Sequence, residues 1–130
     1  MQSKFEKFAR SDFALEIRER GKIVFRSKKD GVGGLLAFVK KRGRRHRDLV
    51  VFDEVVGRAA ALLFVYLGAK EVYGLRGSES ASRTLRQFKI KFSFSQTIKN
   101  VLNKDKTGPC PLEILSRAKT PAELYNSLKG

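Results

Sequence analysis

An alternation of strand-like and helix-like segments in the middle of the chain most constrains its fold. Leu49–Phe52 is a short, continuous apolar run, which is typical of a central strand buried on both faces. Residues 55–67 predict a long apolar helix. Strands at 71–75 and 90–94 flank a further helix over 78–88. This order predicts an α/β fold, a three-layer α/β/α sandwich whose sheet is mostly parallel.

The N-terminal part of the chain predicts a β-hairpin. Phe13–Arg18 alternates apolar and charged residues, as a half-buried strand does. Arg20-Gly21 predicts a tight turn, and Lys22–Ser27 a second strand. The hairpin contributes an antiparallel pair, so we expect a mixed sheet. A short opening helix over 2–9 and a second helix over 35–41 complete this part.

The C-terminal part predicts three short helices. Residues 97–102 have a helical pattern, and Pro111 is suited to the first turn of a second helix. Thr120 and Glu123 form a capping-box signature for a last helix over 121–129. The 130 residues contain no repeat and no long linker. We therefore expect residues 1–130 to form a single domain.

The net charge is the strongest functional signal in the composition. Lys and Arg number 28 against 13 Asp and Glu, which gives a formal net charge of +15. Such an excess attracts polyanions because binding releases counterions from them. The sequence therefore favours RNA or DNA, or a nucleotide, as the partner.

Several features predict the surroundings of the protein. The one cysteine, Cys110, excludes an internal disulfide framework. No apolar run approaches the length of a membrane helix, and residues 1–10 lack the apolar segment of a signal peptide. We expect a cytoplasmic protein with no membrane partner. The sequence leaves the oligomeric state open.

A basic segment over 40–47 concentrates the charge. Its six cations are suited to contacts with phosphate groups, which position a nucleic acid without reading its sequence. No recognition helix, zinc finger or aromatic RNA-reading strand accompanies them. The segment therefore predicts sequence-nonspecific binding, and a merely solvated loop is the alternative. The candidate nucleic-acid-binding residues are Lys40, Lys41, Arg42, Arg44, Arg45 and Arg47.

Two segments resemble a known family. Asp53–Leu63 is similar to the D-K-V-V-G-K-A-A-A-L-L segment of the domain-of-unknown-function 1893 family. Asn103–Glu113 resembles that family's N-R-x-x-x-G-x-C-P-M-E segment. The resemblance implies a cytidine-deaminase-like fold that lacks the deaminase zinc site and has no assigned activity. Glu54 and Arg58 stand where the family usually has lysines, and at Glu54 the charge is reversed.

The residue types exclude the zinc chemistry of nucleobase deaminases. Those enzymes hold zinc with one His or Cys and two further Cys. This chain has one histidine, His46, and one cysteine in total. The positions that would open the two ligand-bearing helices read Val56-Gly57-Arg58 and Ser78-Glu79-Ser80. We expect no metal and no cofactor.

A second hypothesis is an enzyme with non-deaminase chemistry, and whether the protein is catalytic stays open. Cys110 precedes a predicted helix, where a thiolate is stabilised, although it also suits a small buried apolar position. Asp53 ends a predicted central strand, where ligands of α/β sheets bind, although it also suits a helix cap. The candidate catalytic residues are Cys110, Glu113 and Asp53, and the candidate ligand-binding residues are Gly57, Arg58 and Asn103.

Overall fold

A computed structural model of the chain describes residues 2–29, 32–43, 48–102, 106, 108 and 110–129. The element bounds, in chain order, are α1 (Gln2–Ala9), β1 (Leu15–Glu19), β2 (Lys22–Ser27), α2 (Gly33–Arg42), β3 (Leu49–Val56), α3 (Arg58–Leu67), β4 (Glu71–Ser78), α4 (Glu79–Gln87), β5 (Lys91–Ile98), α5 (Pro111–Ser116) and α6 (Pro121–Lys129).

The five strands form one sheet in the order β2-β1-β3-β4-β5. β1 is antiparallel to both β2 and β3, whereas β3, β4 and β5 are parallel to one another. The prediction of an α/β fold with a mixed sheet is confirmed. The prediction that the sheet is mostly parallel is wrong, because the pairings divide equally. The first strand of the hairpin joins β3, which adds a second antiparallel pair.

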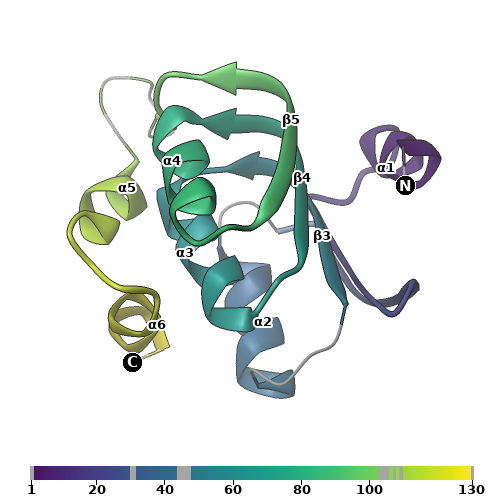
Figure 1. Cartoon of the computed structure of the whole chain (residues 1–130), viewed down its shortest axis with the longest axis horizontal. Coiled ribbons are helices and arrows are strands. Elements are labelled where there is room, and N and C mark those ends of the chain that lie inside the picture. Colours follow the sequence, from purple (N-terminus) through teal and green to yellow (C-terminus); the bar gives the residue numbers. More distant parts are fainter. Residues whose placement is uncertain are drawn as a thin grey trace.

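Helices cover the two faces of the sheet unequally. α2, α3, α4 and α6 lie on one face, and α1 lies on the other (Figure 1). Phe5 and Phe8 of α1 pack against Phe52 and Tyr73, and form a small second core there. The larger core lies under the other helices.

α3 is the central helix of the larger core. Its sequence, RAAALLFVYL, is apolar on nearly every side, and seven of its ten residues are buried. Such a helix needs cover on several sides, which α4, α5 and α6 provide. Gly68 ends it with φ 78°, a left-handed conformation that favours glycine.

Several predicted boundaries move in the structure. β3 continues to Val56 because Val55 and Val56 pair with Arg76 and Gly77 of β4, so the following helix begins three residues later than expected. The expected helix over 97–102 is absent from these described residues, because β5 pairs with β4 as far as Ile98. The opening helix, the hairpin and the last helix lie where the sequence places them. None of the described helices is long and apolar enough to cross a membrane.

Candidate functional site

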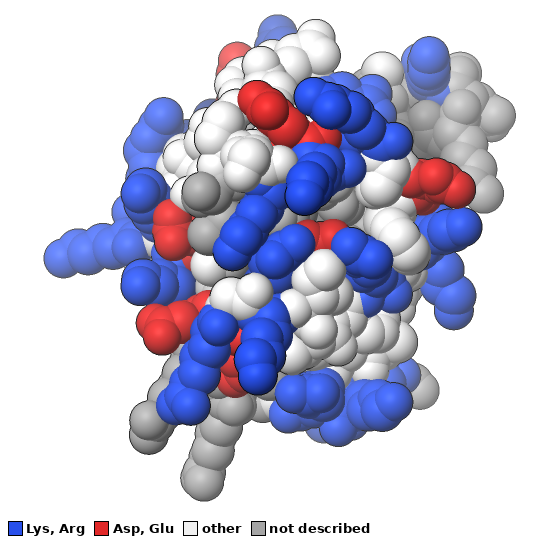
Figure 2. All heavy atoms as spheres, turned by 90° about the vertical axis from the view of Figure 1, so that its right-hand side faces the viewer, with Lys and Arg blue, Asp and Glu red and all other residues white. Residues whose placement is uncertain are grey.

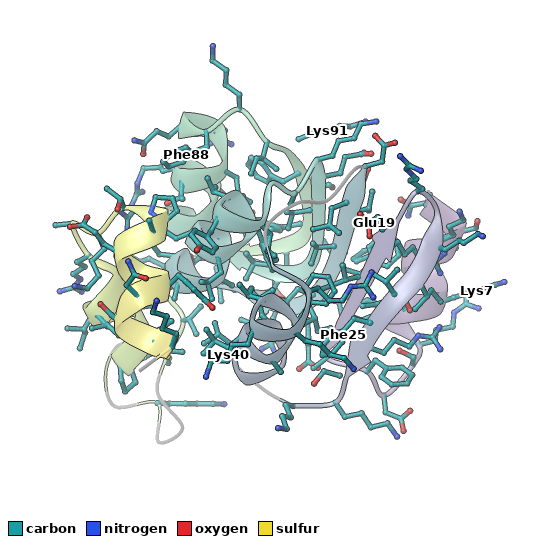
Figure 3. All side chains as sticks on the ribbon, turned by 90° about the horizontal axis from the view of Figure 1, so that it is seen from below. Lys7, Glu19, Phe25, Lys40, Phe88 and Lys91 are labelled. Carbon is teal, nitrogen blue, oxygen red and sulfur yellow. The ribbon has the colours of Figure 1, made fainter. Side chains whose placement is uncertain are left out.

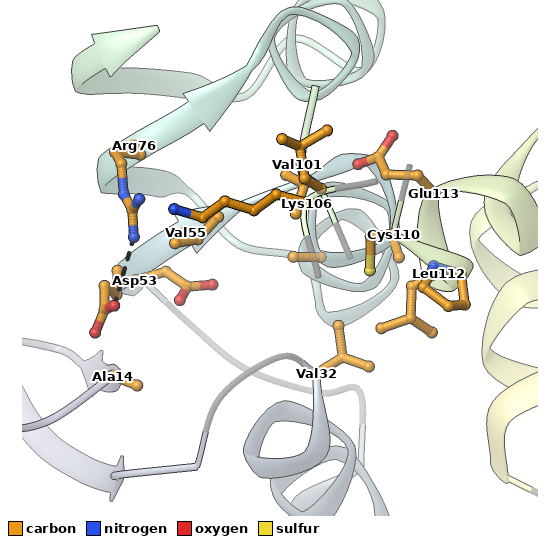
Figure 4. Close-up of a pocket in the computed structure, with 16 residues that line it drawn as sticks. Ala14, Val32, Asp53, Val55, Arg76, Val101, Lys106, Cys110, Leu112 and Glu113 are labelled. Carbon is orange, nitrogen blue, oxygen red and sulfur yellow. Dashed lines mark ion pairs between the residues drawn. The ribbon is translucent and has the colours of Figure 1, made fainter. Parts of the chain in front are cut away.

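A cleft of about 1020 Å³ lies at the carboxyl ends of β3 and β4. Ligands of open α/β sheets bind at this end of the strands. The starts of α3 and α5 and the chain around Val101 form its other walls (Figure 4). Apolar side chains make up most of the lining, and the residues that carry functional groups are Asp53, Glu54, Arg76, Lys106, Cys110 and Glu113.

Asp53 lies within β3 and lines the cleft. One interpretation of the sequence is that Asp53 caps a helix. It does not, because the strand continues for three residues beyond it. Removal of its carboxyl from water raises its pKa to about 8, although hydrogen bonds from the backbone of Val55 and Glu54 lower it in part. Asp53 is therefore mostly uncharged near neutral pH.

Two cations lie near Asp53 at the same end of the cleft. Arg76 of β4 places Nη2 3.7 Å from Oε1 of Glu54. The Lys106 side chain extends across the cleft toward Arg76 and Val55 (Figure 4). No carboxylate in the described part of the chain forms an ion pair with Lys106. Since Asp53 is mostly uncharged, this end of the cleft carries a positive excess.

Glu113 caps the start of α3 from a distance of 55 residues along the chain. Its Oε1 accepts a hydrogen bond of 2.7 Å from the backbone N–H of Arg58, and Glu113 is buried. A carboxylate is stabilised at a helix N-terminus by the free N–H groups and the helix dipole. A Cβ on Gly57 would collide with this carboxylate and would lie 3.2 Å from Val101. Glycine at 57 therefore gives space to Glu113.

The Arg58 side chain links three helices and does not line the cleft. Its Nε donates to the backbone oxygen of Ser116 in α5 at 3.1 Å, and Nη1 donates to Oγ1 of Thr84 in α4 at 2.9 Å. Arg58 and Glu113 together fasten α5 to the start of α3. The Arg58 side chain, a candidate for ligand binding, therefore holds helices together in the structure.

Cys110 lies at the N-cap position of α5 and is half-buried. Its sulfur faces the cleft beside Leu112 and Glu113 (Figure 4). Its backbone N–H donates to the oxygen of Val101 at 2.9 Å, which fixes the loop that leads into α5. The cleft thus gathers Cys110, Glu113 and Asp53, the three candidate catalytic residues.

The basic segment is only partly described. Lys40, Lys41 and Arg42 form the last turn of α2, so the helix expected over 35–41 extends by one residue at this end. Arg42 makes an ion pair of 3.6 Å with Glu19. Lys40 lies far from Lys7 of α1 when the molecule is seen from below (Figure 3). Five residues named above lie outside the described residues: Arg44, Arg45, His46, Arg47 and Asn103.

A second basic surface, which the sequence argument did not single out, lies on the side of α1 and the β1–β2 hairpin. Figure 2 shows Lys and Arg spread over this side, with fewer Asp and Glu between them. We call it the basic face; α1, the turn after it and the hairpin supply Lys4, Lys7, Arg10, Arg18, Arg20, Lys22, Arg26 and Lys28. The sequence pattern does not show that these cations share one surface, because only the fold brings α1 and the hairpin together.

Glu16 organises part of the basic face. It is buried beneath two arginines, with Oε2 2.8 Å from Nε of Arg18 and Oε1 3.0 Å from Nε of Arg26. Arg18 also lies over the ring of Phe52 and Arg26 over that of Phe13. These contacts hold two guanidinium groups in place at the surface.

Within the described ranges, no three His, Cys, Asp or Glu side chains gather closely enough to hold a metal ion. Asp53 and Glu54 are neighbours in the chain, but the Glu113 carboxylate lies at the start of α3.

The topology defines an α/β protein with a mixed five-stranded sheet and a cleft at the carboxyl ends of β3 and β4. The family model of TM1506, a domain of unknown function (DUF1893), matches residues 3–130, and the chain belongs to this family. The crystal structure of a DUF1893 family protein, TM1506, from Thermotoga maritima is similar, with a TM-score of 0.86 and 26% sequence identity. The match covers 98% of this chain and 86% of that one. No curated protein matches the sequence.

Proposed function

We propose that this DUF1893 protein is a zinc-free, cytidine-deaminase-like domain that binds RNA or DNA through phosphate contacts, with little preference for base sequence. Two kinds of observation support the proposal: the arrangement of the elements and the distribution of charge. The second carries the functional part, since a fold alone hosts many functions.

The arrangement of α3 and α4 supports the deaminase-like part. Each helix follows a parallel strand, and the two helices pack against each other. In a deaminase, zinc ligands stand at the starts of the corresponding helices. Here the starts are Gly57-Arg58, held by the Glu113 carboxylate, and Ser78-Glu79. A carboxylate from α5 therefore occupies one helix start, where a metal ligand would be expected.

The observation that carries the nucleic-acid part is the shortage of free carboxylates. Most described acidic side chains are already engaged, so they do not neutralise the remaining cations. Glu123 belongs to a capping box, Glu113 caps α3, and Asp53 is mostly uncharged. Those engaged in ion pairs are Asp12, Glu16, Glu19, Asp48, Glu54 and Glu71.

On the basic face, exposed cations are left over. Lys4, Lys7 and Lys22 are exposed, and no described carboxylate forms an ion pair with them. Cations without partners keep their attraction for phosphate, and several on one face act together on a polyanion. We therefore assign the main contact with nucleic acid to the basic face, with the basic segment at the end of α2 as a second contact.

The test is a salt titration with mixed-sequence RNA and DNA. We compare the parent with a face variant, Lys4→Gln with Lys7→Gln and Lys22→Gln. A matched control removes the same charge elsewhere, by Arg83→Gln with Arg117→Gln and Lys129→Gln. These control residues are exposed and come from α4, the chain after α5, and α6.

The parent should bind both nucleic acids, and its affinity should fall steeply with salt. Each phosphate contact contributes about −0.7 to −0.9 to the slope of log K against log salt. The face variant should lower that slope by about 2 units if each lysine contacts one phosphate. The control should change it by less than about 1 unit. Undetectable binding of the parent at low salt would contradict the proposal.

The basic segment is tested separately. Arg42→Ser combined with Arg44→Ser, Arg45→Ser and Arg47→Ser should lower the slope by about 2–4 units if each arginine touches a phosphate. An unchanged slope would restrict the nucleic-acid contact to the basic face.

The alternative function is an enzyme of non-deaminase chemistry. The observation that favours it is that Asp53, Cys110 and Glu113 all line one cleft. The Glu113 carboxylate is, however, held by the Arg58 amide, which leaves Asp53 and Cys110 as the groups open to a ligand. An enzyme predicts that Asp53→Asn or Cys110→Ser alters ligand turnover and leaves the salt slope for nucleic acid unchanged.

A further inference from the structure

The cleft has two chemically different ends. Val32, Val101 and Leu112 provide apolar surface around the part nearest α5, and Cys110 lies among them (Figure 4). The other end holds Asp53 and Arg76, over which Lys106 extends. Binding sites for small molecules commonly combine an apolar wall with a few polar groups that fix orientation. The volume of about 1020 Å³ is sufficient for such a molecule.

The charged end is suited to an anion. Arg76 forms an ion pair of 3.7 Å with Glu54, and both side chains are nearly half exposed. An ion pair this exposed is weak, so Arg76 is able to bind an anionic ligand in place of Glu54. Lys106 has no ion-pair partner in the described part of the chain and provides a second positive group. A guanidinium and an ammonium on two sides of a cleft form a good receptor for phosphate or carboxylate oxygens.

The carboxyl group of Asp53 does not oppose this assignment near neutral pH. Its burial raises its pKa to about 8, so the group is mostly protonated and able to donate a hydrogen bond to an anion. The charged groups that face it are Glu54 on its own strand, Arg76 from β4 and Lys106. Above the pKa of Asp53, its negative charge would repel an anionic ligand.

We propose that the cleft binds a small organic anion, with its apolar body against Val101 and Leu112 and its anionic head between Arg76 and Lys106. The head group is a phosphate or a carboxylate, which share the chemistry that these two cations recognise. The basic face contributes none of these residues, so this inference does not depend on nucleic-acid binding.

The test uses four simple probes: phenyl phosphate, benzoate, phenol and inorganic phosphate. Their affinities are measured by calorimetry, and the site is located by changes in backbone amide NMR signals. A site with two ends should bind phenyl phosphate or benzoate at least about 10-fold more tightly than phenol and inorganic phosphate, since each fragment loses one set of contacts. The signals of Val55, Val101 and Leu112 should shift.

Variants assign the two ends. Arg76→Gln and Lys106→Gln should each weaken the anionic aromatic probe about 10-fold, because a charge-assisted hydrogen bond contributes about that factor. Arg76→Lys should retain part of the affinity, which separates charge from folding effects. Arg83→Gln, on the exposed side of α4, is the matched control and should have no effect.

Cys110 supplies an independent readout, because its sulfur faces the same cleft. Phenyl phosphate at a concentration that half-saturates the parent should slow alkylation of Cys110, and most of this protection should be lost in Lys106→Gln. The inference is overturned if phenyl phosphate and benzoate bind no more tightly than inorganic phosphate. It is also overturned if Arg76→Gln and Lys106→Gln bind them as the parent does. Failure of the face variant to alter nucleic-acid binding would leave the cleft assignment standing.

Discussion

The cleft and the basic face use charged groups in different ways. In the cleft, Glu113 is buried against the start of α3, and Asp53 is half-buried within β3. On the basic face, Lys4, Lys7 and Lys22 extend into solvent without an ion-pair partner among the described residues. Buried polar groups contribute to stability through specific contacts, whereas solvated charges contribute little to it. Substitutions in the cleft should therefore change folding, and those on the face should change binding.

The largest effect on stability is expected for Gly57→Ala. The added Cβ would collide with the Glu113 carboxylate, and β3, α3 and α5 all meet here. Overpacking of a buried site costs about 1–3 kcal/mol, and loss of the cap would add to it, so we expect a decrease in the free energy of unfolding of about 3 kcal/mol. Urea denaturation measures it.

The double variant Gly57→Ala with Glu113→Ala sharpens this prediction. Removal of the carboxylate frees the space that the new methyl group needs. The two substitutions should therefore be less harmful together than the sum of their separate effects. Strict additivity would mean that Gly57 and Glu113 do not contact each other as the structure places them.

Glu113→Ala alone should lower the free energy of unfolding by about 2 kcal/mol, because a hydrogen bond to a charged group is lost and the start of α3 is left without a cap. Glu113→Gln keeps an acceptor oxygen for the Arg58 amide and should lose only about half as much. Equal losses for Ala and Gln would indicate that the negative charge, rather than the hydrogen bond, stabilises the helix.

Asp53→Asn should change how stability depends on pH. The folded state keeps the Asp53 proton up to a pKa of about 8, whereas the unfolded chain loses it near the ordinary value of 3.8. The parent therefore loses stability as the pH rises between these values, and the variant lacks this loss. Relative to the parent, Asp53→Asn should gain at least about 1 kcal/mol between pH 5 and pH 9.

Denaturation curves for both proteins at several pH values measure this gain. The gain should level off above the folded-state pKa of about 8. Three charged groups of the described residues face Asp53: Glu54, Arg76 and Lys106. They are present in both proteins, so their contributions to stability cancel in the comparison. A constant difference from pH 5 to pH 9 would show that Asp53 is ionised throughout this range.

The smallest effect on stability is expected for the face variant, Lys4→Gln with Lys7→Gln and Lys22→Gln. Exposed substitutions usually change stability by less than about 0.5 kcal/mol. Relief of repulsion within a chain of formal net charge +15 would make the change slightly favourable. A loss comparable to that of Glu113→Ala would contradict the distinction between the two regions. Thermal and urea denaturation measure it.

Two helix starts show what the sequence can and cannot reveal. Ser78 caps α4 through its own side chain, which accepts a hydrogen bond of 3.0 Å from the Ala81 amide, and this local pattern is readable from sequence. α3 lacks such a side chain at Gly57, and its cap comes from Glu113. Only tertiary packing supplies that contact, so the sequence placed the start of α3 too early.

The candidate site also contains residues that the sequence could predict and residues that it could not. Asp53, near the end of β3, could be predicted from element order, and Glu113, in α5, from the segment that resembles the family. The presence of Arg76 and Lys106 in the cleft could not, because they come from different parts of the chain. The net charge predicted a polyanion partner, but the basic face forms only when α1 packs on the sheet beside the hairpin.

The most direct test of the proposed function compares the salt dependence of nucleic-acid binding for the face variant and for its charge-matched control. Both remove three positive charges. A localised face predicts that only Lys4→Gln with Lys7→Gln and Lys22→Gln lowers the slope of log K against log salt, by about 2 units. Equal slopes for the two variants would show that the net charge acts without a defined binding surface, which would contradict the account.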